Sequence, residues 1–174
     1  MISQRGDRLL MERRWARVCL WCLLLVIMAL IFGFSSEDGE TSMATSEVIA
    51  RPIAETIAQR RKVPKSQFKR LLNDVQWYVR KTAHFLEYAA LGVVLYLLHA
   101  SYHRKQPMVW SVVLSAVYAG TDEIHQLLSG ERTGMWEDVL LDTCGAFAGV
   151  MAAFLLLKLC RYIAEKRKTK TQFT

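Results

Sequence analysis

Residues 108–126 read MVWSVVLSAVYAGTDEIHQ, an apolar run that passes directly into a cluster of ionisable side chains. The apolar part ends at Gly120, and Asp122, Glu123 and His125 follow at once. The run reaches the roughly 20 residues that a helix needs to cross a membrane only when this cluster is included. Ionisable side chains in a membrane helix cost free energy and often mark functional sites. This stretch therefore predicts a membrane-spanning helix with a functional site at one end.

The composition of the whole chain also indicates a membrane protein. Of its 174 residues, 52% are hydrophobic, and they form long apolar runs separated by polar segments. The formal net charge is +7, but lysine and arginine flank the apolar runs, a pattern that orients membrane proteins. The sequence Cys19-x-x-Cys22 lacks the soluble βαβ context of a redox motif, and all four cysteines lie in or beside apolar runs. We therefore expect one membrane domain with no nucleic-acid partner.

The apolar runs predict an all-α fold, a four-helix transmembrane bundle. The predicted spans are residues 18–34, 83–102, 108–128 and 138–160, and together they define a membrane domain over residues 18–160. Basic tails precede and follow this domain, at residues 1–17 and 161–174. A signal peptide would resemble the first run, but this run is long for one and the following sequence is a poor cleavage site. We expect an uncleaved helix.

Residues 35–80 form a long loop that is expected to carry two amphipathic helices. Isoleucines recur at every fourth position in the first, namely Ile49, Ile53 and Ile57. Pro64 is expected to break the chain before the second, whose apolar stripe comprises Phe68, Leu71, Leu72, Val75 and Val79. Trp77 and Tyr78 are typical of anchors at the level of lipid headgroups. The pattern favours two helices lying on the membrane surface.

The distribution of charge predicts the orientation. Four spans place both termini on the same side of the membrane, and both tails are basic. The turn between the second and third spans is also basic, whereas the segment after the first span carries Glu37, Asp38, Glu40 and Glu47. The positive-inside rule then places both termini in the cytoplasm and the long loop outside.

With this orientation the ionisable residues of the spans gather at the outer face. They come from three predicted spans and one loop: Lys81, His84, Glu87, Asp122, Glu123, His125, Arg132, Asp138 and Asp142. Helical spacing places Lys81 and His84 on one face, and Asp122 and His125 on another, with Gln126 beside them. We expect one polar pocket that opens to the exterior, with Ser35 and Ser36 capping or lining it.

Six motifs occur along the chain in a characteristic order. They are Phe34-Ser35-Ser36, Lys81-x-x-His84-x-x-Glu87-Tyr88, Leu91-Gly92, Asp122-Glu123-x-His125-Gln126, Gly130-x-Arg132 and Asp138-x-x-x-Asp142-x-x-Gly145. In this order and spacing they resemble the VanZ-like family, over most of the chain except both tails and the middle of the long loop. Two features depart from the family pattern: Glu37 stands where members usually carry glutamine, and the turn before Arg132 lacks a frequent proline.

The resemblance implies a multi-pass protein of the bacterial cytoplasmic membrane. The founding member of the VanZ-like family is associated with low-level resistance to the glycopeptide teicoplanin, but many members have no antibiotic role attached. The family pattern reveals no reaction. It therefore supports the fold and the position of the site more than any particular chemistry.

Two hypotheses account for the polar residues by function. In the first, a hydrolase or transferase acts on a phosphate-bearing lipid or envelope precursor. Lys81 and Arg132 would hold phosphate oxygens, and His84 or His125 would act as nucleophile or general acid or base. Orienting or further basic groups would come from Glu87, Asp122, Asp138 and Asp142, whereas Ser35, Ser36, Glu123 and Gln126 would contact the ligand. In the second, a non-catalytic accessory protein binds an envelope lipid, a glycopeptide or a partner protein through the same residues.

Other interpretations remain open. His84, Glu87, Asp122 and His125 offer ligands for a divalent metal, although Lys81 would repel a cation, and no cofactor is otherwise expected. The charges could also pair with one another and serve only helix packing. Transport is disfavoured because no polar path crosses to the other face. The sequence does not indicate the oligomeric state.

Overall fold

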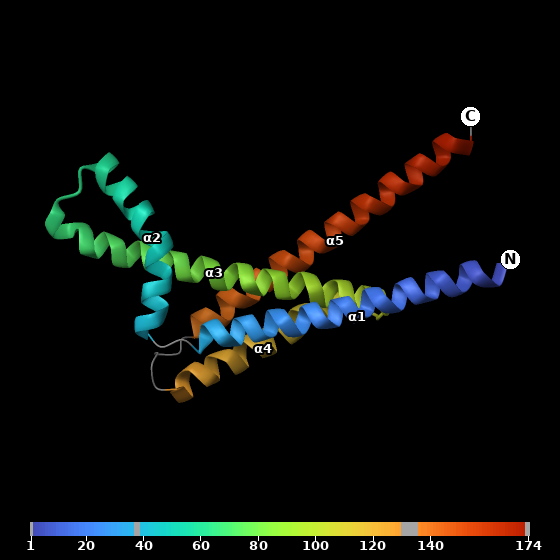
Figure 1. The fold of residues 1–174 in the computed structure, drawn as a ribbon, viewed down its shortest axis with the longest axis horizontal. Coiled ribbons are helices and arrows are strands. Elements are labelled where there is room, and N and C mark those ends of the chain that lie inside the picture. Colours follow the sequence, from blue (N-terminus) through green and yellow to red (C-terminus); the bar gives the residue numbers. More distant parts are fainter. Residues whose placement is uncertain (1, 37–38, 130–135, 173–174) are drawn as a thin grey trace.

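The computed structural model describes residues 2–36, 39–129 and 136–172, and this part of the chain is all helical. The helices are α1 (Ile2–Ser35), α2 (Gly39–Arg61), α3 (Lys65–Ser101), α4 (Pro107–Ser129) and α5 (Trp136–Gln172). In Figure 1, α1, α3, α4 and the first half of α5 form a bundle, and α2 folds back along the first half of α3. The all-α class predicted from the sequence is confirmed.

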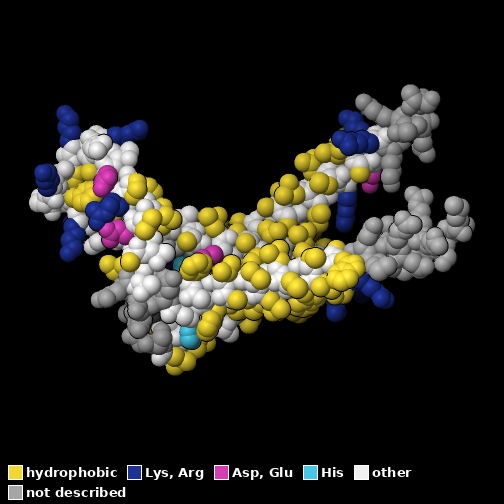
Figure 2. All heavy atoms as spheres, viewed as in Figure 1, with side chains coloured by type: hydrophobic (Ala, Val, Ile, Leu, Met, Phe, Trp, Pro, Cys, Tyr) yellow, Lys and Arg dark blue, Asp and Glu magenta, His cyan; other side chains and the backbone are white. Residues whose placement is uncertain are grey.

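Three helices are long and apolar enough to cross a membrane within the described ranges. They are Arg14–Ser35 of α1, Lys65–Ser101, which is α3, and Trp136–Arg167 of α5. Figure 2 shows apolar side chains along the bundle, with lysine and arginine gathered beyond it on the α2–α3 pair and near the ends of α1 and α5. The protein is therefore a multi-pass membrane protein. The stretch 108–128 corresponds to α4, whose last turns carry Asp122 and Glu123.

The structure differs from the predicted loop over residues 35–80. α3 begins directly after Pro64, as expected, but it continues without interruption to Ser101. A helix of 37 residues is about 55 Å long, nearly twice the hydrocarbon thickness of a bilayer. The second amphipathic helix and the second span are thus one helix, because between Pro64 and Ser101 the sequence contains no further proline and only Gly92 as a glycine.

The apolar stripe at the start of α3 is covered by α2. Leu72 and Val75 pack against Ala50 and Ala54, and all four side chains are buried. Of the isoleucine stripe that was expected to face the membrane surface, Ile49 and Ile53 are exposed, whereas Ile57 packs partly buried against this contact. The small alanine side chains allow the two helices to approach closely, which the bulkier isoleucines would prevent. A packed hairpin of α2 and α3 therefore replaces two separate surface helices.

α5 crosses α3 at a contact made by glycines. A Cβ atom added to Gly145 would collide with the backbone carbonyl of Phe85, and one added to Gly149 would collide with the carbonyl of Ala89. Gly92 of α3 lies equally close to the Ala146 carbonyl. The absence of side chains lets the backbones touch, as in other membrane helix pairs with small residues four positions apart. Beyond this crossing, α5 leaves the bundle (Figure 1).

Side-chain contacts join α1 to its neighbours at two places along its length. The Arg17 guanidinium donates to the Ser101 carbonyl at 2.7 Å and lies 4.4 Å from the centroid of the Tyr102 ring. Further along, the Tyr118 hydroxyl of α4 donates to the Met28 carbonyl at 2.8 Å. These contacts hold α1 beside the end of α3 and the middle of α4.

Candidate functional site

A buried polar cluster lies where the end of α1 meets α3, α4 and α5. We define it as Ser35 of α1, Tyr88 of α3, Asp122 and Gln126 of α4, and Asp142 of α5. Each of these side chains is at most 6% exposed. Polar groups are rarely so buried in a membrane helix bundle unless they have a structural or functional role. Four helices therefore converge on one polar centre.

Gln126 links α1 to α4 within this cluster. Its side-chain nitrogen donates to the Ser35 hydroxyl at 2.5 Å and to the Asp122 carboxylate at 3.3 Å. The Gln126 amide can reach the Asp122 carboxylate because residues four apart lie on the same face of a helix. The prediction that these residues gather with Ser35 agrees with this geometry, although they are separated by 91 positions in sequence.

Two members of the cluster have polar atoms without a hydrogen-bond partner in the described part of the chain. They are the hydroxyl of Tyr88, whose side chain is completely buried, and Oδ1 of Asp142. Leaving a buried polar group unpaired costs about 1–3 kcal/mol. The negative charge of Asp122 acts on both residues at short range. A molecule that donates hydrogen bonds to Asp142 and accepts one from Tyr88 would relieve this cost.

A second group of ionisable residues borders the cluster on α3. His84 Nδ1 lies 3.8 Å from Glu87 Oε2, and the spacing of three residues places both on one side of the helix. Asp122 lies near enough to Glu87 for their charges to repel. Glu123 is also buried, at 8% exposure. The interior is thus rich in carboxylates, which favours positively charged or hydrogen-bond-donating ligands.

His125 lies at the rim of the cluster beside the end of α1. Its Nε2 is 3.3 Å from the Ser36 hydroxyl oxygen, and its ring packs on Phe32 with centroids 4.7 Å apart. The Ser36 hydroxyl donates to the Phe32 carbonyl at 2.7 Å. Since a hydroxyl has one proton to donate, its oxygen then accepts from an Nε2–H group of His125. In this arrangement the histidine holds the serine and does not take its proton.

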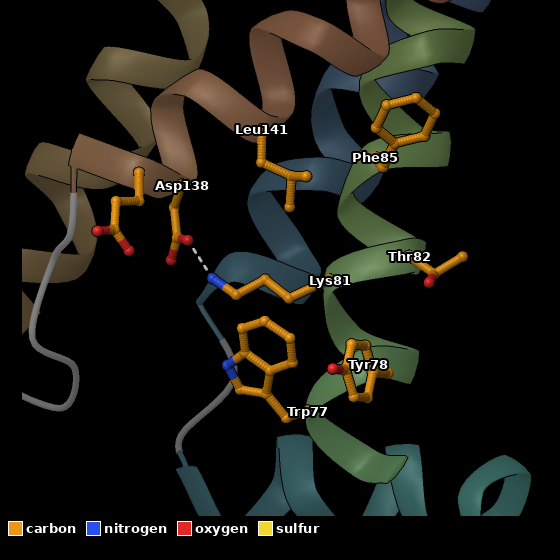
Figure 3. A pocket seen from close by; sticks show the side chains of 8 residues that line it. Trp77, Tyr78, Lys81, Thr82, Phe85, Asp138 and Leu141 are labelled. Atoms are coloured by element: carbon orange, nitrogen blue, oxygen red, sulfur yellow. Dashed lines mark hydrogen bonds and ion pairs between the residues drawn. The ribbon is translucent and has the colours of Figure 1, made fainter. Parts of the chain in front are cut away.

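An ion pair between Lys81 and Asp138 connects α3 to α5 near the start of α5, before the glycine crossing. The Lys81 ammonium donates to Asp138 Oδ1, and the two side chains are 23% and 29% exposed. The pair lies in a groove of about 550 Å³ lined by Trp77, Tyr78, Lys81, Thr82, Phe85, Glu137, Asp138 and Leu141 (Figure 3). The sequence predicted both charged residues as site members, but it did not predict that they pair.

This ion pair is expected to contribute modestly to stability. Lys81→Met and Asp138→Asn should each lower the free energy of unfolding by about 1 kcal/mol, because the partly exposed pair is screened by water. The double variant should lose less than the sum of the two, and a double-mutant cycle from thermal unfolding in detergent measures the difference. Strict additivity would contradict the pairing.

The structure does not bring all predicted residues together. Ser35, Asp122, Gln126 and Asp142 meet in the cluster, whereas Ser36 and His125 pair at its rim. Lys81 and Asp138 lie in the groove, and Arg132 lies outside the described residues. Tyr88 was not predicted as a site residue, although its position one turn after His84 was a usable signal.

No group of three or more histidine, cysteine, aspartate or glutamate side chains close enough to hold a metal ion occurs among the residues described. The four residues considered as metal ligands do not form one group. His84 and Glu87 face each other on α3, and His125 contacts Ser36. Asp122 accepts from Gln126.

Comparison with protein families gives one match. The model described as VanZ/LLP1 matches residues 20–158, which is most of the chain and includes every residue of the buried polar cluster. No curated protein and no solved structure matches the chain.

Proposed function

The chain belongs to the VanZ/LLP1 family, and we propose that it recognises the polar head of a phosphate-bearing lipid or lipid-linked precursor of the bacterial cell envelope. The observation that carries this proposal is the buried polar cluster, in which the Tyr88 hydroxyl and Asp142 Oδ1 lack partners among the described residues. A ligand head with hydroxyl or amino groups would complete their hydrogen bonds. Packing alone does not require two such groups at one centre.

The proposed topology adds α4 as a span to the three long apolar helices and has both termini in the cytoplasm. The basic ends of α1 and α5 would then face the anionic inner leaflet, in agreement with the positive-inside rule. The buried polar cluster would lie at the outer end of the bundle, and the α2–α3 hairpin would stand outside the cytoplasmic membrane. A lipid head at the outer leaflet could reach the cluster without crossing the membrane.

The balance of charge indicates how the head would lie. Glu87, Asp122 and Asp142 gather three carboxyl groups on this side of the site, which favours hydroxyl or ammonium groups that donate hydrogen bonds. A phosphate would be repelled there and would instead lie toward Lys81, where a cation is available. We place Arg132 in the same phosphate-binding role. Recognition without reaction would be an accessory function, and a glycopeptide such as teicoplanin, which carries many hydroxyl and amide groups, is a second ligand of this kind.

One contact favours catalysis as a second candidate. His125 Nε2 and the Ser36 hydroxyl are 3.3 Å apart, which is within reach of a nucleophile and a general base once the serine rotates away from Phe32. Such a pair would support hydrolysis or transfer at a phosphate-bearing lipid. The test of recognition therefore includes a readout for turnover.

Binding should depend on Asp142 in the purified protein. We expect Asp142→Asn to weaken retention of phosphorylated envelope lipids about tenfold, since the charged acceptor becomes a weaker neutral group. Binding is measured in detergent with a panel of such lipids and with teicoplanin, by mass spectrometry of the complex. Thr143→Val is the matched control, because this neighbouring hydroxyl bonds only to its own helix at Val139.

The outcomes separate the alternatives. Equal binding by wild type, Asp142→Asn and Thr143→Val would contradict recognition at the buried polar cluster. Released phosphate or an altered lipid mass that disappears in both Ser36→Ala and His125→Ala would establish catalysis. Binding that persists without any product in wild type would assign the accessory function.

A further inference from the structure

The groove between α3 and α5 is a separate feature from the buried polar cluster. Its α3 residues include Trp77, Lys81 and Phe85, which follow one another at intervals of four and so share a face. Tyr88 follows about two turns after Lys81, beyond the groove, where it is completely buried. The groove volume, about 550 Å³, lies within the range of roughly 300–1,000 Å³ found for small-molecule sites.

Polarity changes along the length of the groove. Figure 3 shows the Lys81 and Asp138 side chains meeting across it, with Trp77 and Tyr78 on one side of this pair and Phe85 and Leu141 on the other. Phe85 and Leu141 come about one helical turn after Lys81 and Asp138 respectively, and thus lie nearer the crossing of the two helices at Gly92 and Gly149. One end of the groove is aromatic and charged, and the other is apolar. A membrane lipid has the same order, with a polar head followed by an apolar chain.

The charges in the groove favour one kind of headgroup. Lys81 offers a cation, while Glu137 and Asp138 offer two carboxylates, so the lining carries an excess of negative charge. A purely anionic headgroup would find one favourable and two unfavourable partners. A zwitterionic headgroup would find partners for both of its charges. The exposed rings of Trp77 and Tyr78, which lie edge to face, add surfaces that attract an ammonium group.

We propose that this groove binds a zwitterionic phospholipid. Its phosphate lies at Lys81, displacing Asp138 as the partner of the ammonium group of the lysine. Its amine lies between the carboxylates of Glu137 and Asp138 and the aromatic rings, and an acyl chain follows Phe85 and Leu141 toward the membrane interior. This site shares Lys81 with the ligand head proposed for the buried polar cluster, whose phosphate also lies toward that lysine, but none of the residues that define the cluster lines the groove.

Selective retention of phosphatidylethanolamine would demonstrate the site. Full-length protein in detergent is mixed with dioleoyl-phosphatidylethanolamine or dioleoyl-phosphatidylglycerol, and bound lipid is measured by native mass spectrometry. We expect the ethanolamine lipid to bind about tenfold more tightly, the difference typical of one charge-assisted contact. Leu141→Trp should abolish this binding by filling the groove. Leu86→Trp, at an exposed position of α3 that does not line the groove, should bind as wild type does.

A second variant tests the charge argument without changing the packing. Glu137 lies at an exposed position, so Glu137→Gln should fold normally and lose most of the preference for the ethanolamine lipid over the glycerol lipid. Equal retention of both lipids by wild type would overturn the proposal, as would unchanged selectivity in Glu137→Gln. Full binding by a folded Leu141→Trp would do the same. Lipid selectivity that survives Asp142→Asn would show that the groove binds independently of the buried polar cluster.

Discussion

Gly149→Leu is expected to prevent α5 from packing against α3. A single Cβ atom at this position would already collide with the backbone carbonyl of Ala89, and a backbone cannot move aside as a flexible side chain can. Adding a whole leucine side chain should therefore cost about 3 kcal/mol or more. The expected result is a protein that elutes as aggregate or unfolds at a much lower temperature in detergent.

Alanine substitutions test the same contact, because helix propensity and packing predict opposite changes in stability. By helix propensity alone, alanine in place of glycine stabilises a helix by about 1 kcal/mol. Gly149→Ala and Gly145→Ala should instead destabilise the protein, because the added methyl meets the backbone of α3. Gly33→Ala and Gly120→Ala are matched controls, since nothing lies within 4 Å of a Cβ atom at either position. Destabilisation of equal size at all four glycines would contradict the close crossing.

Gln126→Leu is expected to disrupt the buried polar cluster. The substitution removes the donor to the Ser35 hydroxyl and to Asp122, while the shape of the side chain changes little. Each buried group that loses its donor costs about 1–3 kcal/mol, so the loss should be clearly measurable by thermal unfolding. Binding at the cluster should fall as well, because Asp122 would no longer be held in position.

The control for this variant is the adjacent position. Leu127→Met changes an exposed side chain on the same turn of α4 and should leave stability and binding unchanged. Ser35→Ala combined with Gln126→Leu should cost less than the sum of the two single changes, because the hydroxyl without a donor is gone. A Gln126→Leu variant as stable as Leu127→Met would show that the amide does not hold α1 to α4.

The position of the site along each helix could be predicted because it depends on local sequence. Asp122 follows directly on an apolar run, so its depth in a membrane helix depends only on run length and the rise of the helix. The same reasoning placed Lys81 and Asp142 near helix ends. Gly145 and Gly149 have the spacing of small residues at close helix contacts, and in the structure they touch α3.

The partners of these residues could not be predicted in the same way. Periodicity shows which side chains share a face, but the neighbour of that face depends on how the helices cross. The Lys81–Asp138 pair joins positions 57 residues apart and exists because α5 touches α3 at its glycines. Similarly, the stripe containing Leu72 and Val75 was interpreted as facing lipid, whereas α2 covers it. An amphipathic pattern requires an apolar partner but does not specify a membrane or a second helix.

The sequence by itself determined that this protein is helical, that it is built for a membrane and that ionisable residues lie at the ends of its apolar runs. These properties follow from run length, charge and the spacing of residues within each helix. Only the tertiary structure decided that α3 is one long helix paired with α2, that Tyr88 belongs to the buried polar cluster and that Lys81 lies in a groove with Asp138. Those features depend on contacts between distant segments: Ala50 and Ala54 let α2 pack on α3, and Gly92, Gly145 and Gly149 let α5 approach α3.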